Sequence, residues 1–166
     1  MDKGQKVTVI ILAACLAILL IVLLTVFLTR DDASGEFTPP PFEANAKTEF
    51  DEQPPQESQY VPLAVTEEFT VALCANAYVK DGKAEIFYTS LKTNTAWTRI
   101  KLFDEEGNLL GECGILKPGE HVQAISLSSI PKQDTKIKIK IYIYEPETYY
   151  SEGSREVKIN LSIKDS

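Results

Sequence analysis

The sequence predicts an all-β domain, an antiparallel sandwich of about seven strands, behind one membrane-spanning helix and a disordered stalk. Three observations support this prediction. Residues 7–29 are apolar and uncharged, residues 31–68 hold six prolines and ten acidic residues, and residues 69–166 hold short β-branched and aromatic runs separated by turn signals. The predicted organisation is a cytoplasmic tail at 1–6, a helix at 7–29, a stalk at 30–68 and a domain at 69–166.

The apolar block VTVIILAACLAILLIVLLTVFLT contains 23 residues. A helix of this length measures roughly 34 Å, which is enough for a hydrocarbon core of about 30 Å. Lys3 and Lys6 precede the block, whereas Arg30 is followed by Asp31 and Asp32. Because positive residues stay on the cytoplasmic side, we expect a single-pass signal-anchor with the N-terminus inside. The expected partner of this helix is the lipid bilayer of the cell membrane, and the C-terminal domain is expected to be extracytoplasmic.

An alternative arises at 12–15, where Leu-Ala-Ala-Cys matches the pattern at which bacterial lipoproteins are cleaved and lipidated on cysteine. Cleavage before Cys15 would leave about eight apolar residues upstream, which is short for a signal peptide. It would also leave a strongly apolar stretch downstream. An uncleaved anchor explains the whole block.

The stalk carries the whole excess of negative charge. It contains ten acidic residues and one basic residue, Lys47, whereas the domain at 69–166 holds 13 residues of each sign. The net charge of the chain is −7. A segment of this composition buries too little surface to offset the entropy of ordering, so we expect disorder. Basic residues dispersed among acids form no concentrated positive face, so no nucleic-acid partner is expected.

The predicted strands are 69–79, 84–90, 96–103, 109–113, 121–128, 136–144 and 156–164. Asp81-Gly82 between the first two is typical of a tight hairpin, and Pro118-Gly119 of a type II turn. Alternation is clearest in KIKIKIYIY and EVKINLSIK, where one face is apolar and the other polar. The 96 residues from 69 to 164 suit an immunoglobulin-like sandwich, which has about 100.

Enzymatic chemistry finds little support in the sequence. His121 is the only histidine, which excludes a multi-histidine zinc site, and its place beside a turn predicts a surface position. Acidic clusters at 104–106 and at Glu145 and Glu147 lie at predicted strand ends, where turns are polar in any case. Without a nucleophile, a base and a group that orients them, we expect no catalytic residue, no metal site and no cofactor.

Two cysteines lie in the predicted domain, Cys74 and Cys113. A disulfide between them would close a loop of about 40 residues and stabilise the fold by roughly 3–4 kcal/mol. However, Cys74 alternates with Val71 and Leu73, which belong to the predicted core face, so its side chain is expected to point outward unless a bulge intervenes. Both readings stay open.

A candidate interaction face consists of Trp97, Arg99, Tyr142 and Tyr144. By alternation these side chains lie on the outer face of their strands, together with lysines. Aromatic and basic side chains suit a protein interface or the stacking of sugars. The alternative is cross-strand aromatic pairing that shields the sheet.

Several motifs resemble small membrane-anchored immunoglobulin-like proteins of Gram-positive bacteria, a largely uncharacterised family. They are DGKA at 81–84, DEEGNLL at 104–110, the turn GILKPG at 114–119 and YEPET at 144–148. The resemblance covers about residues 69–164 and implies a fold and a cell-envelope location. Cys113 and the segment 133–137 depart from the family pattern.

The sequence and the resemblance together favour a non-enzymatic structural or interaction module of the bacterial cell envelope. Its expected partner is another envelope or surface protein. The alternative is a module that binds cell-wall glycan through exposed aromatic side chains.

Overall fold

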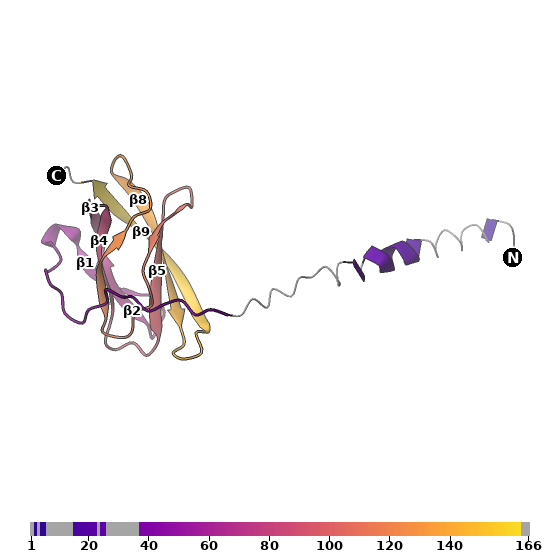
Figure 1. Ribbon diagram of the computed structural model, residues 1–166, viewed down its shortest axis with the longest axis horizontal. Coiled ribbons are helices and arrows are strands. Elements are labelled where there is room, and N and C mark those ends of the chain that lie inside the picture. Colours follow the sequence, from indigo (N-terminus) through magenta and orange to yellow (C-terminus); the bar gives the residue numbers. More distant parts are fainter. Residues whose placement is uncertain (1, 3, 6–14, 23, 26–36, 164–166) are drawn as a thin grey trace. The chain divides into compact units, whose positions relative to one another are not determined.

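The structure is a computed structural model, and it describes residues 2, 4–5, 15–22, 24–25 and 37–163. Figure 1 shows its two units, Met1–Thr38 and Pro39–Ser166, each of which is described by itself. In the first unit, residues 15–22 and 24–25 are helical. Within the described ranges, no helix has the length and apolarity that crossing a membrane requires. Most of the predicted span, namely 7–14, 23 and 26–29, lies outside the described residues, as do residues 30–36 of the predicted stalk.

The second unit is all-β, as the sequence predicts. A short 3-10 helix, η1 (Gln56–Ser58), precedes the strands. The strands are β1 (Tyr60–Ala64), β2 (Thr70–Cys74), β3 (Asn76–Lys80), β4 (Lys83–Ser90), β5 (Trp97–Phe103), β6 (Leu109–Glu112), β7 (His121–Ser126), β8 (Thr135–Tyr144) and β9 (Ser151–Ile163). Each of the seven predicted strands therefore has a counterpart.

The strands form one hydrogen-bonded sheet that folds back on itself. The order is β1-β2-β4-β3-β9-β8-β5-β6, and β7 pairs with β4. Only the β3–β9 pair is parallel among the described strand pairs. The end of the path at β6 approaches the chain just after β7, where the backbone N–H of Ser128 donates to the carbonyl of Leu110 at 2.7 Å. The fold is thus two layers that share the β3–β9 seam (Figure 1).

The core lies between these layers. The inward residues of β8, from Ile137 to Ile143 in steps of two, are at most 1% exposed, and they join Ile86 and Tyr88 of β4 in one apolar cluster. The buried Tyr88 hydroxyl lies 2.5 Å from Thr98 Oγ1, which in turn donates to the Tyr142 carbonyl at 3.0 Å. The polar groups inside the core are therefore satisfied.

The predicted first strand, 69–79, is two strands in the structure. At Ala75 the backbone changes partners, because its N–H donates to the Gln59 carbonyl at 3.2 Å and its carbonyl accepts from Asn160 N–H at 3.0 Å. The first of these bonds extends the pairing of β2 with β1, and the second begins the pairing of β3 with β9. The division into β2 and β3 thus marks the point where the chain passes from one neighbour to the other.

The prediction of a disordered stalk is wrong from residue 39 onward. Residues 39–64, here called the covering segment, are bonded to the sheet along their length. Ile115 N–H donates to the Pro41 carbonyl at 2.9 Å, Lys47 and His121 exchange two backbone hydrogen bonds, and β1 pairs with β2. The folded domain therefore begins at about Pro39 and not at Phe69.

Individual aromatic side chains attach the covering segment to the sheet. The Phe50 ring centroid lies 4.0 Å from that of His121, 5.7 Å from that of Phe87 and 5.8 Å from that of Tyr60. Phe87 is an outward residue of β4 that is only 1% exposed, because this segment covers it. A segment attached through isolated anchors needs no apolar period, and for this reason periodicity did not reveal it.

Candidate interaction face

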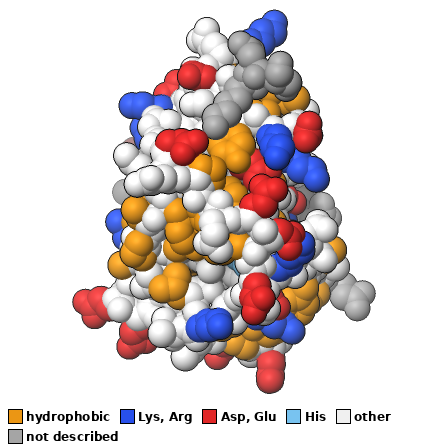
Figure 2. All heavy atoms as spheres, turned by 90° about the vertical axis from the view of Figure 1, so that its left-hand side faces the viewer, with side chains coloured by type: hydrophobic (Ala, Val, Ile, Leu, Met, Phe, Trp, Pro, Cys, Tyr) orange, Lys and Arg blue, Asp and Glu red, His pale blue; other side chains and the backbone are white. Residues whose placement is uncertain are grey.

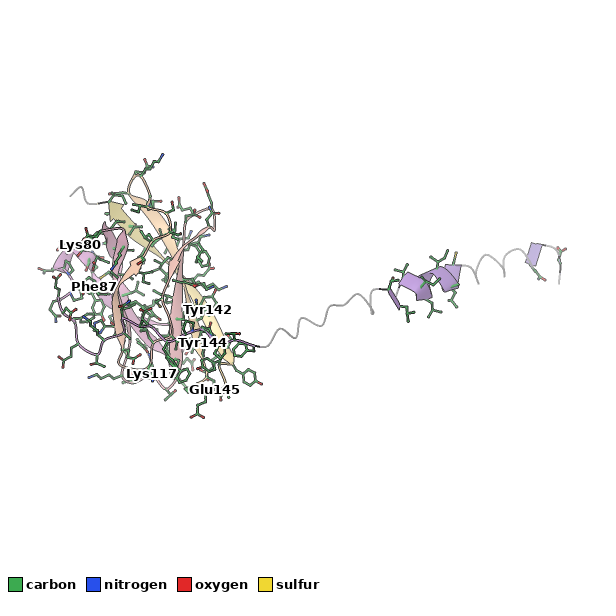
Figure 3. All side chains as sticks on the ribbon, in the orientation of Figure 1. Lys80, Phe87, Lys117, Tyr142, Tyr144 and Glu145 are labelled. Carbon is green, nitrogen blue, oxygen red and sulfur yellow. The ribbon has the colours of Figure 1, made fainter. Side chains whose placement is uncertain are left out.

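The outer face of β5 and β8 brings the four predicted residues together. Thr98 and Ile100 of β5 and Ile141 and Ile143 of β8 point into the core and are at most 1% exposed, so the alternate side chains point outward. Residues directly opposite each other on the two strands are Trp97 and Tyr144, Arg99 and Tyr142, and Lys101 and Lys140. Figure 3 labels Tyr142 and Tyr144 on this side of the domain and Phe87 on the other.

Trp97 is occupied by contacts within the domain. Its ring lies edge-on to Phe42 of the covering segment, with centroids 4.9 Å apart, and to Tyr149 of the loop after β8, with centroids 5.3 Å apart. Lys117 Nζ lies 4.8 Å from the centre of the Phe42 ring on the same cluster. Trp97 therefore secures the start of the covering segment and the loop, through contacts that differ from the cross-strand aromatic pairing considered above.

Arg99 is also held in place. Its Nη2 lies 2.7 Å from Glu112 Oε1, and its Nε donates to the Cys113 carbonyl at 3.0 Å. Only 14% of the Arg99 side chain is exposed. Lys101 Nζ shares the same carboxylate at 3.2 Å from Oε2. The guanidinium thus joins β5 to the end of β6 and offers little of its surface to a partner.

Tyr142 and Tyr144 are the members of the predicted face that remain available. Both are half-buried, and their rings are nearly parallel, with an interplanar angle of 18° and centroids 6.4 Å apart. Lys140 Nζ lies 5.3 Å from the centre of the Tyr142 ring, within the range of a cation–π contact. This pair offers a flat aromatic strip along the outer side of β8.

A group of lysines continues this strip toward the other end of β8. From the sequence, the basic residues of the domain were expected to be dispersed among acidic ones. Lys138 of β8 lies directly opposite Lys158 of β9, and Lys136 lies two residues further along the same face. A small hollow of about 130 Å³ is lined by these three lysines together with Glu105 and Ile137. The signal in the sequence was the alternation KIKIK, which places every lysine of the run on one face.

The two cysteines of the domain are free thiols on opposite sides of the β2 layer, so the disulfide considered above is not formed. Cys113 belongs to the apolar core, where burial raises the pKa of its thiol to about 12. Cys74 points outward as alternation predicts, yet it is fully buried because η1 covers it and its Sγ lies 3.1 Å from Ser58 Oγ.

His121 is buried and not on the surface as predicted. It is 3% exposed, because the Phe50 ring covers it, and burial lowers the pKa of its imidazole. It lines one end of a polar cleft of about 350 Å³ between β4, β7 and the covering segment. Figure 2 views the left-hand side of Figure 1, where both signs of charge surround hydrophobic side chains. On the face shown there, basic and acidic side chains are intermixed, without a patch of a single charge sign.

The acidic clusters organise turns. Asn108 donates its backbone N–H to Asp104 Oδ1 at 2.7 Å and its side-chain amide to Asp104 Oδ2 at 2.8 Å, and these bonds lower the pKa of the Asp104 carboxyl. Thr148 Oγ1 donates to Glu145 Oε2 at 2.6 Å in the next loop. In the part of the chain that the structure describes, no three histidine, cysteine or acidic side chains gather as a metal site would require.

Comparison with protein-family models, with curated proteins and with solved structures gave no match to this chain.

Proposed function

We propose that the chain is a non-enzymatic interaction module of the bacterial cell envelope, which binds its partner with the outer face of β8. The observation that carries the proposal is the Tyr142–Tyr144 strip. Two nearly parallel aromatic rings lie side by side on a sheet face, next to the lysines of β8, although nothing in the core requires tyrosine there. Tyrosine gives a large contact area at low entropic cost, which is typical of binding surfaces.

The strand pairing supports an immunoglobulin-like arrangement for this module. In that fold one sheet contains strands A, B and E in neighbouring positions, and the other contains C, F and G. The order β2-β4-β7 corresponds to the first set and β5-β8-β9 to the second. The tyrosine strip would then lie on the strand equivalent to F.

The uncharged block at 7–29 supports a location at the membrane. Its 23 residues would span a hydrocarbon core as a helix, and the lysines at 3 and 6 favour an exported C-terminal domain. The resemblance to envelope proteins of Gram-positive bacteria points to the same location. The expected partner is then another envelope or surface protein.

Cell-wall glycan is the second candidate partner. The near-parallel rings of Tyr142 and Tyr144 favour it, because sugar rings stack on aromatic faces. Trp97 contributes little to this reading, since Phe42 and Tyr149 contact its ring within the domain.

Site-specific photo-crosslinking in intact cells tests the proposal. A photoreactive phenylalanine analogue at position 142 or 144 is expected to give discrete protein adducts, recovered in the membrane fraction after alkaline extraction. The same analogue at Tyr150, an exposed tyrosine outside the strip, serves as the matched control. Equal adducts from all three positions, or none from 142 and 144, would overturn the assignment of the face. Retention of the purified chain on isolated wall, lost in the Tyr142→Ala/Tyr144→Ala variant, would identify glycan as the partner instead.

A further inference from the structure

Lysines face one another on both sides of β8. Lys138 lies directly opposite Lys158 of β9, and Lys140 lies directly opposite Lys101 of β5. Like charges in directly opposed positions destabilise a sheet. Core packing does not explain them, because the core face of β8 is made of isoleucines and the outer face could hold any polar side chain. This arrangement concentrates positive charge at a cost in stability.

The nearby carboxylates neutralise only part of this charge. Glu112 is engaged by Arg99 and Lys101, and Glu156 lies opposite Lys140. Glu105 shares the hollow with Lys136, Lys138 and Lys158. Within the described range 37–163, none of these last three lysines forms an ion pair. The outer face of β8 and β9 therefore keeps a net positive charge.

The spacing of the lysines indicates the form of the ligand. Alternate residues of an antiparallel strand are about 6.8 Å apart, so Lys136, Lys138 and Lys140 form a straight row along β8 with that repeat. The row runs directly into the Tyr142–Tyr144 strip. A linear ligand lying along β8 would meet ammonium groups first and aromatic rings next.

We propose that this face binds an extended polyanion that carries phosphate groups, with its charges along the lysine row and uncharged units against the tyrosine strip. This inference rests on the proposed binding role of the same face and names the chemistry of its ligand. Lysine binds phosphate as a compact point charge that can approach the oxygens from any direction, whereas arginine matches both carboxylate and phosphate with a two-pronged contact. The one arginine of the face, Arg99, is already engaged by Glu112. The groups of the ligand are thus met by lysine alone, which gives a carboxylate no two-pronged contact and suits the tetrahedral oxygens of a phosphate polymer.

Binding to inorganic polyphosphate tests the proposal. The full chain, purified in a nonionic detergent, is titrated into fluorescently labelled polyphosphate, and anisotropy is followed from about 50 to 300 mM NaCl. The Lys138→Gln/Lys158→Gln variant is expected to bind about tenfold more weakly and to lower the slope of log K against log salt by about 1.4, as expected for two lost phosphate contacts on a single-stranded polyanion. The matched control is Lys80→Gln/Lys83→Gln in the β3–β4 hairpin, which should bind as the unaltered chain does.

Three results would overturn the proposal. The first is that polyphosphate does not bind at 50 mM NaCl, and the second is that the control variant loses as much affinity for polyphosphate as the Lys138→Gln/Lys158→Gln variant. The third is that polyglutamate of the same length binds equally well, which would indicate an acidic protein as the ligand. The proposed function has a separate test. If crosslinks at positions 142 and 144 persist while polyphosphate fails to bind, the polyanion inference is wrong and the interaction module stands.

Discussion

His121 shows how one side chain reports on the covering segment. Its ring lies against Phe50 and is almost completely removed from solvent. Burial lowers the pKa of the imidazole, opposed by the negative charge of Asp51 and assisted by the positive charge of Lys47. The neutral form is therefore the one that the folded domain prefers.

Acidification should destabilise the domain through this residue. The unfolded chain binds the proton at about pH 6.5, and the folded chain binds it only at lower pH, so the unfolded state holds more protons in between. The His121 contribution to stability is thus complete above the unfolded pKa and declines as the pH falls toward the folded pKa. Urea unfolding at several pH values should show a steeper loss for the unaltered chain than for His121→Gln. Because the chain has one histidine, its NMR titration gives the folded pKa directly, and a value at or above 6.5 would contradict this account.

Among the elements, the covering segment depends on a close approach at Gly114. A Cβ on this residue would lie 2.5 Å from the backbone nitrogen of Glu43 and 2.7 Å from its Cα. The segment uses that space for two hydrogen bonds, from Gly114 N–H to Glu43 Oε2 at 2.7 Å and from Glu43 N–H to the Ile115 carbonyl at 2.9 Å. Backbone atoms cannot move aside as a flexible side chain can.

Gly114→Ala should therefore displace the start of the covering segment. We expect the free energy of unfolding to fall by about 1–3 kcal/mol, the usual cost of inserting a methyl group where there is no room. Hydrogen exchange should increase at residues 41–47, while β8 remains protected. Gly4→Ala is the matched control, because a Cβ there meets nothing within 4 Å. Unchanged exchange at 41–47 in Gly114→Ala would show that the contact is not required.

Sequence patterns predicted those elements in which side chains alternate. β8 was expected at 136–144 and is Thr135–Tyr144, because its isoleucines mark every inward position. The first residues of β9 were missed, since SEGSR has no apolar face and is a strand only through its bonds to β8. The lysines at 136–140 were placed on the outer face with Tyr142 and Tyr144, but the gathering of positive charge there was missed for a related reason. A charge count over the domain sums to zero, and only the pairing of Lys138 with Lys158 shows where the positive charges gather.

At the scale of the whole domain, the covering segment is a structural part and not a spacer. It buries Phe87, His121 and Cys74, which would otherwise lie on an open sheet face. The loss of this cover would also remove β1 from the edge of β2. The minimal folding unit should accordingly include residues from 39.

A fragment of residues 69–166 should be much less stable than one of residues 39–166. We expect the longer fragment to unfold cooperatively on heating and to elute as a single species in size-exclusion chromatography. The shorter fragment should associate through its uncovered apolar face or lose cooperative unfolding. Circular dichroism and chromatography of the two fragments check this expectation. Equal midpoints of thermal unfolding for the two fragments would show that the covering segment does not contribute to the stability of the domain.

The parallel pairing of β3 with β9 has a consequence for the kinetics of folding. It joins residues far apart in the chain, as in the hydrogen bond between Asn76 and Asn160, which are 84 positions apart. Pairings of such high sequence separation slow folding, because a long loop must close before its contacts form. Since the ribosome makes β3 early and β9 late, the nascent domain stays incomplete until residue 163 has been synthesised. Until then, one edge of β3 lacks its partner strand, and an unpaired strand edge is prone to association with other chains.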